Sequence, residues 1–287
     1  LPRVGKATVP PGGLARGGGL EACVARNGTR VGPLMTGLVG FKSRTPYRGG
    51  WCGNEVHAAA FPRALRERAR EATFAFGEAL RKRGYRGYFE LDFLIDRDTG
   101  EVYLGEVNPR ITGASAMTNL AAFAHADAPL FLFHLLEWCN VGFELDVQAL
   151  NARWADPANI DSWGQLVIKH TADTTERILE APRSGVWRMD DDGNVEFVRV
   201  QTHRRTVESE QEAFFLRIAG PGDYKYEGAD LGILITPGRL MTKAHRLTPR
   251  AKAWTEAIVS QFRGEPLAAP QPVAAITPAE VGSFKLL

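Results

Sequence analysis

The chain has 287 residues, 44% of them hydrophobic and 24% charged, so it is long enough and apolar enough to bury a real core. The 35 basic and 33 acidic residues leave a net charge of +2, which gives no general attraction to nucleic acid or to an anionic membrane. Three scattered cysteines and the lack of a long apolar run exclude a disulfide framework and a membrane-spanning helix. We therefore expect a globular protein of a reducing, cytoplasmic compartment, with neither nucleic acid nor membrane as a partner.

The first half of the chain alternates predicted strands and helices. Residues 1–20 contain the run PPGGLARGGG, which can bury little surface, and we expect a flexible leader or a truncated start there. Residues 21–41 are predicted to form a hairpin because Asn27 and Gly28 separate two apolar segments. A glycine-rich loop leads to a helix over residues 61–83, where apolar residues recur at helical spacing. The arginines of that helix are expected to form its solvated face.

Two more strands are predicted at residues 88–95 and 101–107, joined by the turn DRDTG. Residues 116–140 are expected to be helical in two pieces that separate near Pro129. Residues 156–164 have the composition of a linker.

The second half has a different pattern. Short apolar runs such as QLVIKHT, ERILE, GVWRM and LGILITPG are separated by turn residues, which is typical of a strand-rich domain. Residues 248–262 are predicted to form a final helix, and the Pro- and Ala-rich stretch after it a loose tail. The expected boundaries are 1–20 for the leader, 21–150 for the first folded unit, 151–265 for the strand-rich domain and 266–287 for the tail.

The central hairpin carries acids on a strand that is otherwise suited to burial. Because side chains alternate along a strand, Asp92, Glu106 and Asn108 are expected to share the face opposite the apolar one. Carboxylate and amide oxygens are hard ligands that suit Mg²⁺ and leave coordination sites for water and phosphate. Arg110 follows closely and can hold a phosphate or carboxylate group. An ordinary hairpin with surface acids is the alternative interpretation.

This interpretation depends on the register of the two strands. In the register that we expect, Asp92 lies opposite Leu104. Glu106 then lies opposite Glu90. A slip by one residue would turn one set of side chains to the other face and separate the cluster.

The same residues resemble the signature of the ATP-grasp superfamily: an acid on the first strand, Asp92, then EVNPR with Glu106, Asn108 and Arg110, then the turn ITGAS. The resemblance implies an α+β fold in which the two acids and the asparagine hold Mg²⁺ or Mn²⁺ at the phosphates of ATP. It implies that the arginine acts on a phosphate or an acyl phosphate. The chemistry implied is that of a ligase, in which a carboxylate attacks the γ-phosphate and a nucleophile captures the acyl phosphate.

The resemblance covers residues 21–140, which correspond to the carboxy-terminal lobe of the family's fold, an antiparallel sheet with helices. The family's other lobe, with its phosphate-covering loop and its ATP-contacting lysines, would precede this one. Residues 1–19 are too short to supply it, so we expect either a fragment or a product that has lost half of the ATP site. A non-catalytic nucleotide-binding fragment therefore stays open as an alternative.

The second half faintly resembles the closing domain of biotin carboxylases, at WGQLVIKHT and at DLGILITPGR. In that family a glutamate four places after the motif arginine acts as a base towards bicarbonate, and this position is Ala114 here. The favoured function is therefore a carboxylate–amine ligase, with small-molecule or peptide carboxylate and amine substrates. A biotin carboxylase-like carboxylating enzyme is the alternative, and a homo-oligomer is compatible with both.

Substrate contacts are expected in the glycine-rich loop after the first hairpin. Arg48, Trp51 and Glu55 offer a cation, an aromatic wall and an acid there, and the glycines allow the backbone to approach a ligand. An ordinary connecting loop is the alternative. Thr112 and Ser115 are candidates for the acceptor side of the site, with capping of the following helix as their alternative role.

Overall fold

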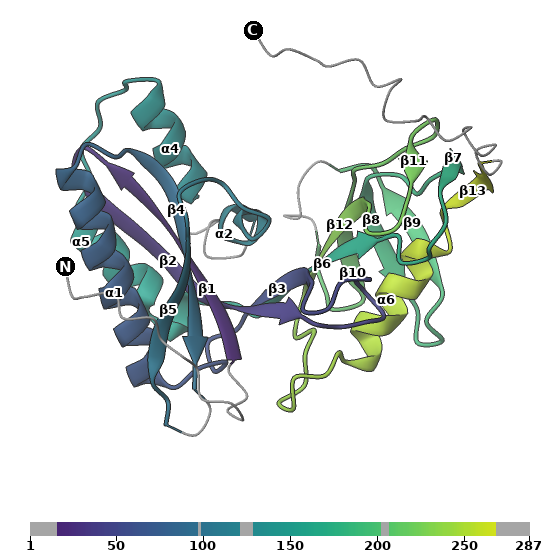
Figure 1. Ribbon diagram of the computed structural model, residues 1–287, viewed down its shortest axis with the longest axis horizontal. Coiled ribbons are helices and arrows are strands. Elements are labelled where there is room, and N and C mark those ends of the chain that lie inside the picture. The colour runs from purple at the N-terminus through teal and green to yellow at the C-terminus, as the bar shows by residue number, and fades with distance from the viewer. Residues whose placement is uncertain (1–15, 97–98, 121–128, 202–206, 268–287) are drawn as a thin grey trace, which may run out of the picture.

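The computed structural model describes residues 16–96, 99–120, 129–201 and 207–267, which form two domains (Figure 1). The first domain comprises strands β1 (Arg16–Ala25), β2 (Gly28–Val39), β3 (Trp51–Val56), β4 (Gly87–Ile95) and β5 (Val102–Asn108) and helices α1 (Arg63–Lys82), α2 (Ser115–Leu120), α4 (Leu130–Trp138) and α5 (Val147–Ala155). After the short 3-10 helix η1 (Pro157–Asn159), the second domain comprises β6 (Trp163–Lys169), β7 (Glu176–Glu180), β8 (Gly185–Met189), β9 (Val195–Arg199), β10 (Glu212–Arg217), β11 (Tyr224–Lys225), β12 (Asp230–Pro237), α6 (Pro249–Val259) and β13 (Arg263–Pro266).

One ten-stranded sheet runs through both domains. Its strand order is β5-β4-β1-β2-β3-β6-β12-β10-β8-β9, and a separate three-stranded sheet has the order β11-β7-β13. The domains meet where β3 pairs with β6, and in Figure 1 these two strands bridge the halves of the molecule. The α+β class is confirmed, and the boundary expected near residue 150 does not interrupt the hydrogen-bonded sheet.

The first hairpin is confirmed, and it starts earlier than expected. Ala25 pairs with Gly28 across a two-residue turn. Strand β1 begins at Arg16, and it pairs with β4 along its whole length. The expected leader boundary at residue 20 is therefore wrong, because backbone pairing with a neighbouring strand does not require apolar side chains. Residues 1–15 lie outside the described part of the chain.

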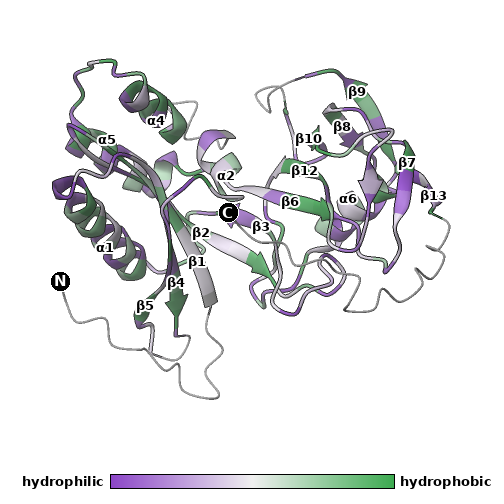
Figure 2. Ribbon diagram, turned by 45° about the horizontal axis from the view of Figure 1, so that its top comes forward, coloured by the Kyte–Doolittle hydropathy of each residue, from purple (hydrophilic) through white to green (hydrophobic). Residues whose placement is uncertain are grey.

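Helices cover both faces of the first domain's sheet. On one face Leu65 and Ala69 of α1 belong to the same buried cluster as Phe89 and Leu91 of β4. In Figure 2 the outer side of α1 is largely hydrophilic, as expected for a helix with one face on a sheet. The opposite face, where α4 covers β1 and β4 and α5 packs against β2, has its own buried cluster: Cys23, Tyr88, Leu130, Phe133, Leu150 and Trp154.

One arginine of α1 departs from the expected solvated face. Arg70 donates hydrogen bonds to the carbonyl oxygens of Val31, Gly32 and Asn151. Burial lowers the pKa of its guanidinium to about 10. The side chain therefore links α1 to β2 and α5, and charge pattern alone could not separate it from its exposed neighbours.

Helix α5 was not predicted, although its first turn carries a capping signal. The side chain of Asp146 accepts hydrogen bonds from the backbone N–H groups of Gln148 and Ala149. The helix expected over 116–140 is indeed divided, with Pro129 as the N-cap of α4. The intervening residues 121–128 lie outside the described ranges.

The second domain confirms the predicted short strands and the last helix. Thr248 caps α6 by accepting from the N–H of Ala251, and Trp254 of α6 is fully buried in this domain's core. The expected linker is shorter than predicted, because it holds η1 and ends where β6 begins at Trp163. The last described strand, β13, pairs with β7 at the point where the tail was expected. None of the helices in the described ranges combines the length and apolar character that a membrane crossing requires.

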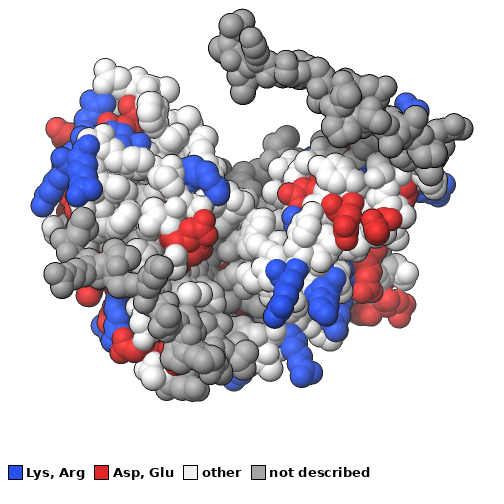
Figure 3. Space-filling model, viewed as in Figure 1, with Lys and Arg blue, Asp and Glu red and all other residues white. Residues whose placement is uncertain are grey.

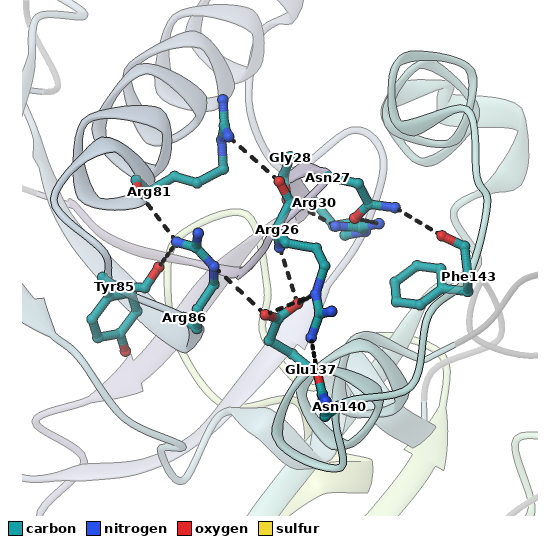
Figure 4. A network of polar contacts seen from close by, with 10 residues as sticks. All are labelled: Arg26, Asn27, Gly28, Arg30, Arg81, Tyr85, Arg86, Glu137, Asn140 and Phe143. Atoms are coloured by element: carbon teal, nitrogen blue, oxygen red, sulfur yellow. Dashed lines mark hydrogen bonds and ion pairs between the residues drawn. The ribbon is translucent and has the colours of Figure 1, made fainter.

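Glu137 of α4 fastens the β1–β2 turn to the rest of the first domain (Figure 4). The backbone N–H of Arg26 donates to its carboxylate at 3.0 Å, and the guanidinium groups of Arg26 and Arg86 lie 3.4 and 3.6 Å from it. Arg30 is fully buried beneath the turn, with its guanidinium 4.7 Å from the ring centre of Phe133. This polar cluster closes the end of the sheet that lies beyond Tyr88.

We expect Glu137→Ala to lower the free energy of unfolding by about 1–3 kcal/mol, because the backbone N–H of Arg26 and two guanidinium groups lose an acceptor whose side chain is only 7% exposed. The surface ion pair between Arg63 and Glu67 provides a control, and Glu67→Ala should change stability by less than about 0.5 kcal/mol. Urea unfolding followed by circular dichroism measures both. Equal losses in the two variants would contradict this role of Glu137.

Candidate functional site

A bulge in β5 determines which side chains of the central hairpin face each other. Ile95 pairs with Val102, one residue later than expected, so an unbroken ladder would set Asp92 opposite Gly105. The register shifts at this point, Gly105 is left unpaired, and Asp92 lies opposite Glu106. The expected pairings were therefore wrong. The acids still share a face. The pairing at the hairpin end is shifted by one residue and the bulge shifts it by one more, and a total shift of two residues leaves each side chain on its original face.

Beyond the bulge, residues from three adjacent strands form two rows on one face of the sheet. Each row crosses β1, β4 and β5: Gly19, Asp92 and Glu106 in one row, and Glu21, Glu90 and Asn108 in the next. The exposure of the acids increases from the inner strand β1 to the edge strand β5. Glu21 and Glu90 are buried, Asp92 is half-buried and Glu106 is exposed. The sheet thus presents carboxylates from its interior to its edge.

The predicted site residues of this hairpin are linked by hydrogen bonds. Asn108 donates from Nδ2 to Oδ2 of Asp92 at 3.1 Å. Arg110 donates from Nη2 to Oδ1 of Asn108 at 3.0 Å, and from Nη1 to the carbonyl of Ile111. The side-chain amide of Asn108 is thus held in one orientation between an acid and a guanidinium. The structure brings the predicted acid of the first strand, Asp92, together with the three predicted residues of EVNPR.

Two carboxyl groups of this face, those of Asp92 and Glu90, ionise with difficulty. Burial, then the neighbouring Glu106, raises the pKa of Asp92. Burial, then the charge of Glu21, raises the pKa of Glu90 to about 8. Negative charge on this face is therefore unfavourable until a cation compensates it.

Glu21 lies deepest and has no exposed surface. Its carboxylate accepts hydrogen bonds from the hydroxyls of Thr112, Ser115, Thr118 and Tyr88. Burial raises its pKa, and these four hydroxyls partly offset that effect. Three of the donors belong to the turn and helix after Arg110, so Glu21 fixes that segment on the sheet.

The rows open into a cavity of about 810 Å³. Its lining includes a first wall formed by Glu90, Asp92, Glu106, Asn108 and Arg110, together with residues from elsewhere in the chain: Val39, Phe41, Trp51, Asn54, Met241 and His245. Glycines of β1 form part of its surface, and a Cβ at Gly19 would lie only 2.6 Å from Oε1 of Glu90. In Figure 3 the face in view is hollowed between the two domains, and basic side chains gather on the adjoining lower part of the second domain.

The predicted substrate residues fall into three groups. Trp51 lines the cavity, and its indole N–H donates to the side chain of Asn54. Thr112 lines the cavity while donating to Glu21, whereas buried Ser115 donates to Glu21 and does not line it. Arg48 is exposed on the loop and lies outside the cavity wall.

Glu55 does not fit its predicted role as a substrate contact. It belongs to β3 and not to the expected loop, and it has no exposed surface. It accepts two hydrogen bonds from Arg239 and one each from the backbone N–H groups of Leu240 and Met241. Glu55 therefore links the two domains through partners 184 to 186 positions away, which no local sequence pattern could reveal.

The donor set of the first wall suits a hard cation. Within the described residues, no three His, Cys, Asp or Glu side chains gather closely enough to hold a metal ion by themselves. The two facing carboxylates of Asp92 and Glu106, with the amide of Asn108, instead offer part of an oxygen shell. Mg²⁺ commonly takes one or two carboxylates and completes its shell with water and phosphate oxygens, so the residues present fit such an ion.

No protein-family model and no curated protein matches this sequence. Solved structures do match. The biotin carboxylase–β,γ-ATP complex from Campylobacter jejuni superposes with a TM-score of 0.52 at 12% identity, over 88% of this chain and 46% of that one. ATP-complexed carboxyaminoimidazole ribonucleotide synthase from Aspergillus clavatus gives 0.50 at 13% identity, over 85% and 51%. The multifunctional pyruvate carboxylase from Rhizobium etli gives 0.50 at 14% identity, over 87% and 20%.

The chain therefore has the ATP-grasp fold, as the carboxy-terminal lobe followed by the further strand-rich domain of biotin carboxylase-like proteins. It spans about half of the length of the first two of these structures. At 12–13% identity the likeness concerns the fold.

Among the cavity residues that sequence reasoning did not propose are Glu90, Gly19 and His245. Glu90 precedes Asp92 by two positions, so strand alternation already placed it on the same face. Gly19 could not be singled out, because only the pairing of β1 with β4 puts it against the acids. His245 had no local signal, since it reaches the cavity from the other domain.

We expect the Glu90 carboxyl to ionise near pH 8 in the metal-free chain. Because its pKa is raised on folding, the folded chain binds the proton more tightly than the unfolded chain. Its contribution to stability is full below its ordinary value of 4.5 and is lost as pH rises through about 8. Carboxyl ¹³C NMR should show this transition in the wild type and not in Glu90→Gln, and Glu90→Gln should be less destabilised by rising pH. A Glu90 transition near pH 4–5 would contradict it.

Proposed function

We propose that this chain carries the metal and phosphate site of an ATP-dependent ligase of the ATP-grasp type, acting with Mg²⁺ (or Mn²⁺). The observation that carries the proposal is the facing pair Asp92 and Glu106, joined through Asn108 to Arg110 on the wall of a large cavity. The ATP-grasp fold supports it, since ATP is present in the Aspergillus clavatus complex.

Asp92, Glu106 and Asn108 are the residues that would hold the ion. Bound Mg²⁺ supplies the positive charge that neutralises nucleotide phosphates during transfer. Arg110 keeps the amide of Asn108 oriented and has a planar, permanently charged group at the exposed end of the row. The chain's own contribution is thus a fixed set of oxygens and one cation, arranged before the ligands arrive.

The substrates that fit this proposal are a carboxylate, activated as an acyl phosphate, and an amine that captures it with release of phosphate. A carboxylating enzyme of the biotin carboxylase type is the second candidate, because the fold is shared with that enzyme. Ala114 lines the cavity at the position where the resemblance would require a carboxylate base, which favours the amine ligase.

We expect Mg-ATP to raise the melting temperature of the chain. Binding at one hundred times the dissociation constant stabilises the folded state by about 2.7 kcal/mol. Glu106→Gln and Asn108→Ala should abolish the shift, because each removes an oxygen ligand or its orientation. Glu101→Gln is the matched control, since Glu101 lies in the same hairpin on an exposed ion pair with Arg68 and should keep the full shift.

Differential scanning fluorimetry measures the shift, and a phosphate-release assay measures turnover. A shift without turnover in the presence of carboxylates and amines would favour the nucleotide-binding fragment. An unchanged shift in both site variants would contradict the assignment of the metal ligands.

Gly19→Ala should weaken Mn²⁺ binding several-fold while the fold stays intact. The new Cβ would lie 2.6 Å from Oε1 of Glu90, so this carboxylate has to move, and it would touch Oδ1 of the neighbouring Asp92 at 3.4 Å. Gly17→Ala is the control on the same strand, because a Cβ there meets no atom within 4 Å. Electron paramagnetic resonance of free Mn²⁺ measures the affinity, and equal affinities in the two variants would contradict the position of the ion.

A further inference from the structure

Asn54 of β3 lines the cavity, and one end of its side-chain amide has no partner. The residue is only 4% exposed. Its Oδ1 accepts hydrogen bonds from Nε1 of Trp51 at 3.0 Å and from Nε2 of Gln165 at 3.3 Å. Its Nδ2 forms no hydrogen bond with the described residues, and it is not one of their enclosed atoms that lack a partner, so this nitrogen reaches open space. The amide therefore presents its N–H groups to the cavity.

The chemistry of the two neighbours fixes which end of the Asn54 amide faces outwards. An indole nitrogen can only donate, so the atom of Asn54 that meets Trp51 is the oxygen. The amide of Gln165 is fixed in the same way, because its Nε2 donates at 2.8 Å to the carbonyl of Gly113, which can only accept. Turning either amide over would bring like groups together. The nitrogen of Asn54 is thus directed away from both neighbours and towards the cavity.

Glycines keep the space between Asn54 and the acids of the first wall open. Gly37 of β2 lies opposite Asn54, and Gly19 of β1 lies opposite Asp92. Both glycines line the cavity, so no side chain rises from these positions of the two intervening strands. Asn54 on β3 and Asp92 on β4 are three strand spacings apart, which corresponds to about 14 Å. A ligand that reaches both residues therefore extends across these glycines.

The lining that β2 and β3 provide around Asn54 is apolar and uncharged. Val39 of β2 pairs with Trp51 of β3, and both line the cavity. A Cβ at Gly37 would lie 3.3 Å from Cγ2 of Val39, so this side chain lies beside the position opposite Asn54. No lining residue of these two strands carries a charge. An N–H donor in such surroundings suits an uncharged carbonyl, because a carboxylate would lose its hydration without gaining a cation.

We propose that Asn54 determines substrate specificity by donating from Nδ2 to an uncharged carbonyl oxygen of the substrate, of the kind found in an amide. This inference rests on the proposed function and deepens it, because the ion and the phosphates lie at the first wall and the carbonyl at the other end of the substrate. Val39 and Trp51 supply apolar surface for the group attached to that carbonyl. A substrate with a carboxylate at one end and an amide carbonyl at the other has the chemistry of an acylated amino acid or a short peptide.

The test uses the whole chain without metal or nucleotide and three aromatic probes of similar size: benzamide, benzoate and benzylammonium. Titrations follow the ¹⁵N signal of the Trp51 indole N–H, assigned through Trp51→Phe. This N–H donates to Asn54, so its signal reports on that part of the cavity. Benzamide should shift the signal saturably and bind there about fivefold more tightly than either charged probe. These titrations of the wild type do not depend on the folding of any variant.

Asn54→Asp keeps an oxygen for Trp51 and Gln165 and replaces the N–H donor by a second oxygen. It should weaken benzamide binding about tenfold, which corresponds to about 1.4 kcal/mol. It should also make benzylammonium the most tightly bound of the three probes. Asn159→Asp introduces the same change at an exposed position of η1 and is the matched control, which should keep the wild-type order of affinities. Circular dichroism checks that both variants are folded.

Absence of a saturable benzamide shift in the wild type would overturn the proposal. So would tighter binding of benzoate or benzylammonium than of benzamide, or a folded Asn54→Asp protein that still prefers benzamide. The titrations contain no Mg-ATP, so a negative result there leaves the metal site unaffected. The absence of a thermal shift with Mg-ATP would instead bear on the proposed function, so the two proposals fail separately.

Discussion

The structure depends on the cost of placing several carboxyl groups on one face of a sheet. Glu21, Glu90, Asp92 and Glu106 extend from the interior to the cavity, and burial raises the pKa of the first three. The innermost acid is compensated by hydroxyl donors, since four of them surround Glu21. Near the outer pair, Asp92 and Glu106, the described residues place the amide of Asn108 and the guanidinium of Arg110. That difference leaves the outer pair suited to a cation and the inner acid suited to holding the backbone in place.

The second constraint is mechanical, because one sheet passes through both domains. β3 pairs with β2 on one side and with β6 on the other. Glu55 of β3 then accepts hydrogen bonds from Arg239 and from the backbone N–H of Met241, which links this part of the second domain to the strand. A cavity between two domains would ordinarily change shape as the domains move. Here the two domains contribute neighbouring strands to one ladder, so backbone hydrogen bonds connect them beside the cavity.

The central hairpin shows how far local patterns reach. Alternation and the EVNPR signature identified Asp92, Glu106, Asn108 and Arg110, and these residues do lie together. The register that supported the prediction was wrong, and the bulge at Gly105 restored the face. Bulges depend on how the strand packs against its neighbours, which spacing along one chain does not encode. The strong family signature succeeded where the geometric derivation from register did not.

By itself, the sequence determined most of the element types, with α5 as an exception, and also the ATP-grasp resemblance and the acids of the first wall, because these rest on short-range periodicity and on a compact motif. Only the tertiary structure decided what those residues face. It moved Glu55 from a substrate contact to a buried anchor, turned Thr112 and Ser115 towards Glu21, and brought His245 to the cavity. The physical reason is common to all three. Burial and partnership are set by strands that pair across long separations, and such partners leave no trace in the local pattern of either segment.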